Sequence, residues 1–192
     1  MDAASTTSGR FTTEKYFELV ERGILSPDDH VELLDGLVVA MPPTTPLHDS
    51  IVHVALDVLQ ATVGRRAAFR VQATFLVGID SALQPDLALV PGSHRDYIHR
   101  HPTRAHLIVE VSLSSLPQDR LTKSAIYARA NVPCYWIVNL RDGCVEVHRD
   151  VDRWKGQYGS VTRAAGDDMI AIDDFPGVAI RAGDLLPPPA LL

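Results

Sequence analysis

Residues 83–91 of this chain read LQPDLALVP. The four residues before the closing proline are all apolar, which is typical of a strand in a protein interior. Pro85 and Asp86 nevertheless stand at the start of that strand. An isolated ionised carboxylate is strongly disfavoured in an interior, so Asp86 needs a hydrogen bond, a charged partner or a bound cation.

A second carboxylate interrupts the next apolar segment, AHLIVEV, at Glu110. If strands 85–90 and 106–112 are neighbours, Asp86 and Glu110 project from one sheet face toward a shared point. Two close carboxylates repel each other unless a cation lies between them. Mg²⁺ suits such a site, because one or two carboxylates, waters and phosphate oxygens hold it. The alternative for either residue alone is a nearby backbone amide or arginine; the pair in this order favours a shared site.

Lys123 is the third candidate. Asp119, Lys123 and Tyr127 are spaced i, i+4, i+8, which places them on one face of a helix predicted over residues 116–130. This helix follows the strand of Glu110, and ligand sites in α/β sheets gather at such strand ends. Lys123 would orient an attacking water and stabilise a developing phosphorane charge. The alternative is an ordinary surface salt bridge.

Glu32, in the segment HVELLDG, is the fourth candidate. It would support a second metal ion or hydrogen-bond a metal-bound water. A half-exposed strand residue is the equally weighted alternative.

The remaining patterns predict a mixed α/β fold in which one sheet is flanked by helices. These patterns indicate a helix at 12–23, a hairpin turning at Asp35-Gly36, an amphipathic helix at 46–64, one strand of period two at 68–78, a hairpin turning at Asp142-Gly143 and short C-terminal strands. We expect a flexible N-terminus (1–11), one domain (12–186) and a flexible tail (187–192).

Composition is that of an ordinary globular domain, with 192 residues, 46% hydrophobic and 22% charged. No apolar run approaches the ~20 residues of a membrane span, and the start, MDAASTTSGR, lacks a secretory signal. We therefore expect a cytoplasmic protein that does not enter a membrane. Cys134 and Cys144 lie far apart along the predicted hairpin, which predicts two reduced thiols rather than a disulfide.

The net charge of −6 does not favour DNA binding, which draws on Lys and Arg to neutralise phosphates. A basic patch, a metal or a partner would have to compensate. The polar segment 94–106 holds four histidines whose spacing matches no zinc motif. Arginines in and near it could contact a nucleic-acid backbone; they are Arg65, Arg66, Arg70, Arg95, Arg100 and Arg104. His48, at the start of the second predicted helix, is interpreted as a capping or packing residue.

Five segments in this order resemble the Uma2 family of restriction-endonuclease-like proteins, which belongs to the PD-(D/E)XK nuclease superfamily. They are ELLDGLVVAMPP (32–43), QPDLALV (84–90), VEVSLSS (109–115), YARA (127–130) and YWIV (135–138). The resemblance spans roughly residues 12–185. It implies a restriction-endonuclease-like α/β fold.

The resemblance also implies a hydrolase, an endonuclease that cleaves DNA phosphodiester bonds with Mg²⁺ or Mn²⁺. Asp86 and Glu110 would be the metal ligands. Ser112 occupies the slot of the superfamily's lysine, which points to Lys123 as its replacement, and Glu32 matches the family's glutamate before DG. A homodimer would suit cleavage of both strands. The rival hypothesis is a catalytically inactive nuclease fold used as a binding or assembly module; hydrolysis of another phosphoester is a third.

Overall fold

The computed structural model describes residues 10–188. The flexible segments predicted at 1–11 and 187–192 therefore lie almost entirely outside the described residues. Within the first of them, the Phe11 N–H donates to the carbonyl of Gly36 at 2.8 Å. None of the described helices is both long enough and apolar enough to span a membrane.

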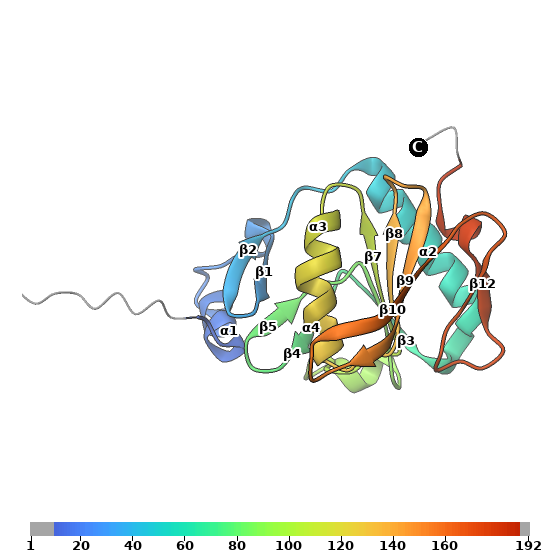
Figure 1. The fold of residues 1–192 in the computed structure, drawn as a ribbon. Helices are drawn as coiled ribbons and strands as arrows, with labels where there is room; N and C mark the ends of the chain where they lie inside the picture. Colours follow the sequence, from blue (N-terminus) through green and yellow to red (C-terminus); the bar gives the residue numbers. More distant parts are fainter. Residues whose placement is uncertain (1–9, 189–192) are drawn as a thin grey trace, which may run out of the picture.

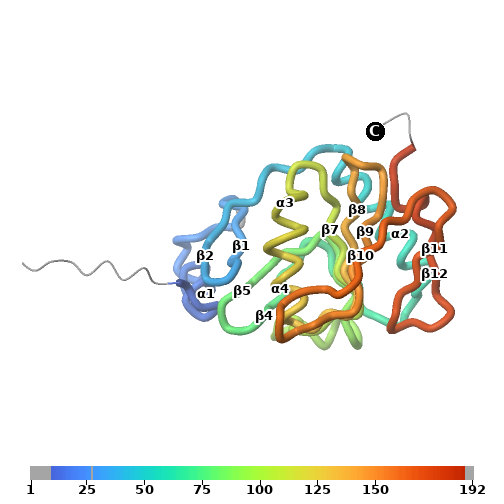
Figure 2. The backbone as a smooth tube through the Cα atoms, in the orientation of Figure 1, coloured from blue at the N-terminus to red at the C-terminus, as the bar shows by residue number. Residues whose placement is uncertain are grey.

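A six-stranded sheet forms the centre of the fold (Figures 1 and 2). Its order is β10-β9-β8-β7-β6-β3. The strands span Ala68–Val71 (β3), Leu87–Val90 (β6), Leu107–Ser112 (β7), Tyr135–Asn139 (β8), Cys144–Asp152 (β9) and Gln157–Ala164 (β10). β7 and β8 are parallel, as the helical crossover between them allows, and every other neighbouring pair is antiparallel. β8 and β9 are joined by a short turn.

Helix α2 (Pro46–Val63) covers one face of this sheet (Figure 1). Its buried residues recur at helical spacing: Ile51, Val52, Ala55, Leu59 and Val63. The C-terminal hairpin of β11 (Met169–Ala171) and β12 (Ala179–Arg181) packs into the same core through Ile170 and Ile180.

One helix of three parts covers the opposite face. It consists of α3 (Leu116–Gln118), a π-helical turn (Asp119–Lys123) and α4 (Ser124–Arg129). This confirms the helix predicted over 116–130. Asn131, in a left-handed conformation with φ of 57°, ends it. π turns inside α-helices are frequent at functional sites.

A second, four-stranded sheet packs on the same side as α4 and has the order β2-β1-β5-β4. Its strands are Val31–Leu34 (β1), Leu37–Ala40 (β2), Phe75–Val77 (β4) and Ser81–Leu83 (β5). The predicted Asp35-Gly36 turn joins β1 to β2, with φ of 48° and 78° at its two residues. Helix α1 (Thr13–Glu21), capped by Thr12, packs Tyr16 with this sheet.

The prediction of a single strand over 68–78 is wrong. β3 belongs to the main sheet and β4 to the smaller one, with a break at Gln72, whose φ is 44°. The apolar residues at every second position from Phe69 to Val77 continue through the break, and no Gly or Pro separates the two short strands, so the sequence pattern is that of one long strand. The strand predicted at 85–90 likewise begins later, at Leu87, so Asp86 immediately precedes β6.

The predicted fold class is confirmed: a mixed sheet flanked by helices, with an N-terminal helix and hairpin and extra C-terminal strands. The Asp142-Gly143 hairpin is present between β8 and β9. Cys134 and Cys144 are free and buried, as expected.

Candidate active site

A pocket of about 540 Å³ opens at the end of the main sheet where β6 begins and β7 ends. All four candidate residues line it: Glu32, Asp86, Glu110 and Lys123. They come from β1, the start of β6, β7 and the π turn, so the pocket lies where both sheets and the second helical layer meet.

Asp86 and Glu110 lie across from each other. β6 and β7 pair with Leu87 opposite Val109, and the same register continued by one residue sets Asp86 opposite Glu110. Directly opposed residues of antiparallel strands share a face, with Cβ atoms about 4.5–5.5 Å apart. The structure therefore places Asp86, just before β6, beside Glu110 of the neighbouring strand β7, and both carboxylates line one pocket.

Asp86 is satisfied mainly through one of its oxygens. Oδ2 accepts a hydrogen bond from the Val111 N–H at 2.8 Å and lies 3.2 Å from His48 Nε2. Oδ1 has a long contact of 3.4 Å with the Gln72 amide. Asp86 thus has the backbone-amide partner that the alternative interpretation required. Its other oxygen, Oδ1, is only weakly hydrogen-bonded.

Glu110 shows the same asymmetry. Its Oε1 accepts from Lys123 Nζ at 3.0 Å and from the Tyr127 hydroxyl at 2.7 Å. Among the contacts of residues 10–188, no hydrogen bond is made by Oε2. Burial raises the pKa of Glu110, and although Lys123 opposes this rise, the carboxylates of Asp119, Asp86 and Glu32 add to it.

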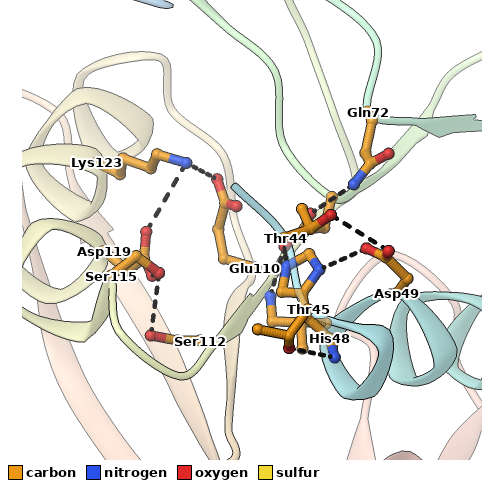
Figure 3. A network of polar contacts seen from close by, with 12 residues as sticks. Thr44, Thr45, His48, Asp49, Gln72, Glu110, Ser112, Ser115, Asp119 and Lys123 are labelled. Carbon is orange, nitrogen blue, oxygen red and sulfur yellow. Dashed lines mark hydrogen bonds and ion pairs between the residues drawn. The ribbon is translucent and has the colours of Figure 1, made fainter. Parts of the chain in front are cut away.

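Lys123 contacts three carboxylates, two of which, Glu110 and Asp119, are shown beside it in Figure 3. Besides Glu110, its Nζ lies 3.5 Å from Glu32 and 3.8 Å from Asp119. Burial alone would lower the pKa of Lys123, but the three carboxylates outweigh burial and raise it above the ordinary value. The predicted face of Asp119, Lys123 and Tyr127 is therefore turned inward to Glu110, and the surface salt bridge of the alternative interpretation is not what forms.

Glu32 is buried rather than half-exposed. Its Oε1 accepts from the Gln84 N–H at 2.6 Å, while Oε2 faces Lys123. Both oxygens are engaged, so Glu32 fixes the lysine and the segment leading to Asp86.

The site has more buried negative charge than positive charge. Four carboxylates are at most 7% exposed: Glu32, Asp86, Glu110 and Asp119. Lys123 and His48 supply at most two positive charges against them. Burial also raises the pKa of Asp119, despite Lys123, so the cluster favours an added proton or cation. A divalent cation would supply two charges, and among the carboxylate oxygens of Asp86 and Glu110, Asp86 Oδ1 and Glu110 Oε2 have the weakest hydrogen bonding.

The donor set fits Mg²⁺ or Mn²⁺ bound through two carboxylates. Across the described part of the chain, no cluster of three or more His, Cys, Asp or Glu side chains is arranged to hold a metal ion. Mg²⁺ needs fewer protein ligands, because it keeps several waters and takes one or two carboxylates together with phosphate oxygens.

Sequence reasoning missed the role of His48. The backbone N–H of His48 donates to Thr45, the cap of α2, but its ring reaches Asp86 and Asp49. Burial would lower the pKa of His48, yet the hydrogen bonds and charges of Asp86 and Asp49 raise it to about 9. Its position in the first helical turn was visible in the sequence, whereas the strand that this turn faces was not.

The arginines predicted to contact nucleic acid do not line the pocket. Segment 94–106 follows Val90, at the end of β6 opposite Asp86. Arg65 and Arg66 follow the C-terminus of α2, about 25 Å along that helix from His48 at 1.5 Å per residue. The four histidines of 94–106 are not gathered at one point: His101 stacks on Phe17 and His106 pairs with Asp174.

Comparisons with known proteins concern the family and the fold of this chain. The model of the Uma2 family, described as "Putative restriction endonuclease", matches residues 13–183. A solved structure from Anabaena variabilis, described as "a putative nuclease belonging to DUF820", superposes with a TM-score of 0.71 at 15% identity, covering 91% of this chain and 97% of that one. This likeness shows the fold alone, and no curated protein matches. Because the family model spans nearly all described residues, the chain belongs to the Uma2 family.

Proposed function

We propose that this protein is a Mg²⁺- or Mn²⁺-dependent endonuclease that hydrolyses phosphodiester bonds of DNA. One observation carries the proposal: the excess of buried carboxylates around Lys123, open to a pocket through Asp86 and Glu110. The family and the fold support a nuclease. Burying an unpaired ionised carboxylate costs free energy, and a divalent cation bound between Asp86 and Glu110 would offset this cost.

In this proposal Asp86 and Glu110 hold the metal ion. When bound, the ion would polarise the scissile phosphate and lower the pKa of a coordinated water. Lys123 contributes a fixed positive charge beside Glu110, toward which a phosphate oxygen or an attacking water is drawn. Glu32 holds Lys123 in place, since both of its oxygens are already engaged.

Plasmid nicking tests this function. The purified chain should relax supercoiled plasmid with Mg²⁺ or Mn²⁺ and not with EDTA, and Asp86→Ala and Glu110→Ala should each lower the rate at least 100-fold. Asp57→Ala is the matched control, because Asp57 is exposed on α2 and outside the pocket. Equal nicking by Asp86→Ala and the control would contradict the proposal.

A nuclease-fold binding or assembly module is the second candidate. The net charge of −6 and the distance of the arginines from the pocket favour it. The same assay separates the two, because a binding module retains DNA in a mobility-shift experiment without cutting it. Activity on bis(p-nitrophenyl) phosphate alone would instead indicate another phosphoester substrate.

We further infer a homodimer working in the cytoplasm. Two copies would present two sites to a duplex, and free, buried cysteines suit a reducing compartment. Sedimentation equilibrium near 42 kDa, twice the 21.0 kDa of one chain, is expected. A monomer at micromolar concentration would contradict the dimer but not the proposed metal-dependent hydrolysis.

A further inference from the structure

The ring of His48 lies between the carboxylate of Asp49, shown in Figure 3, and that of Asp86. Nε2 is 3.2 Å from Asp86 Oδ2, and Nδ1 is 3.2 Å from Asp49 Oδ1. The backbone of the same residue is occupied separately, since its N–H donates to Thr45 at 3.2 Å. Capping of α2 therefore needs only the backbone of residue 48, and the ring is available for another role.

We propose that His48 is a positioning residue that orients the carboxylate of Asp86 toward the divalent cation; this rests on the proposed function. The ring N–H and the Val111 N–H both point at Oδ2. Two donors on one oxygen fix the rotation of the carboxylate group. The other oxygen, Oδ1, is then directed away from them and keeps only the 3.4 Å contact with Gln72.

Asp49 fixes the ring from behind. Its Oδ1 faces His48 Nδ1, and its Oδ2 accepts from the Thr44 hydroxyl at 3.2 Å. The side chain of His48 is 15% exposed, whereas that of Asp49 is 51% exposed. The chain of contacts thus runs from the pocket rim at Thr44 through Asp49 and His48 to Asp86.

This arrangement is expected to act on metal affinity more than on folding. The ring lies outside the apolar cores of the protein, which α2 enters through Ile51, Ala55 and Leu59. Groups that hydrogen-bond a ligating side chain typically contribute 10- to 100-fold to metal affinity. Loss of the ring would let the Asp86 carboxylate rotate, so that both of its oxygens compete for the Val111 N–H.

Calorimetric titration of the full chain with Mn²⁺ alone tests the proposal. His48→Ala should raise the Mn²⁺ dissociation constant about 10- to 100-fold. His48→Gln should recover most of the affinity, because its amide N–H reaches about as far as Nε2. His53→Ala is the matched control on the exposed side of α2 and should bind as the wild type does. Asp49→Ala should weaken binding by a smaller factor than His48→Ala.

Three outcomes would overturn the proposal. If His48→Ala binds Mn²⁺ within twofold of wild type while Asp86→Ala does not bind, His48 has no positioning role and the proposed function stands. If His48→Gln is as weak as His48→Ala while both melt at the wild-type temperature without metal, the hydrogen bond to Asp86 is not what matters. If the wild type itself binds no Mn²⁺ at millimolar concentration, both proposals fail together.

Discussion

Replacing Lys123 by Met removes the cation that three buried carboxylates share. Nζ lies 3.0 Å from Glu110, 3.5 Å from Glu32 and 3.8 Å from Asp119. Methionine has a similar volume, so the change removes charge more than packing. Removing one partner of a buried ion pair costs about 3–5 kcal/mol. We expect Lys123→Met to lower the free energy of unfolding by about this amount at pH 8.

The loss should depend on pH, because burial raises the pKa of Glu110. The Glu110 carboxyl group therefore binds a proton more tightly in the folded chain than in the unfolded chain. The resulting stability is fully present below the unfolded pKa of about 4.3 and is lost as the pH rises through the folded pKa. Without Lys123 the folded pKa rises further, so the deficit of the variant should be small at pH 5 and largest at pH 8.

Urea unfolding at both pH values measures the effect, with the fully buried Trp136 as a fluorescence probe. Lys15→Met is the matched control: Lys15 pairs with Glu18 on the surface, and its loss should cost no more than about 0.5 kcal/mol. If Lys123→Met is as stable as Lys15→Met at pH 8, the carboxylates are not held by this lysine and the reasoning is refuted.

Two further changes probe charges outside the pocket. Burial lowers the pKa of His148 to about 4. Between pH 6.5 and 4, His148 is therefore protonated in the unfolded chain but neutral in the folded chain. The free energy of unfolding, measured with urea, should fall by about 3 kcal/mol across this pH window. His148→Leu should reduce this fall. An unchanged pH dependence in the variant would show that other groups cause the acid sensitivity. Arg120→Ala leaves the buried Glu146 without its 2.9 Å partner and should cost about 2–3 kcal/mol, whereas Arg163→Ala, at 3.6 Å and exposed, should cost under about 1 kcal/mol. Equal losses for the two arginines would contradict this ranking.

The sequence predicted the features that depend on local spacing. Two apolar segments taken as neighbouring strands predicted that Asp86 and Glu110 share a face, and helical spacing predicted the same of Asp119, Lys123 and Tyr127. Both patterns survive in the structure because the register of β6 and β7 and the inward side of the helix follow from the burial of apolar neighbours. The π turn leaves this alignment intact.

Features that depend on long-range packing were not predicted. The His48 ring reaches Asp86 because the N-terminal end of α2 lies at the start of β6, a placement that no local pattern encodes. Glu32 is buried because the smaller sheet packs beside α4, which turns a strand that could be half-exposed into an interior one. The break at Gln72 also follows from long-range packing, because β3 pairs in the main sheet and β4 pairs in the smaller one.

A crystal soaked in Mn²⁺ shows whether Asp86 and Glu110 bind one metal ion together. We expect one anomalous peak in the pocket, about 2.1–2.2 Å from an oxygen of Asp86 and from an oxygen of Glu110, with water completing the coordination. A peak that touches only one of these carboxylates, or a pocket without a peak at millimolar Mn²⁺, would contradict this expectation.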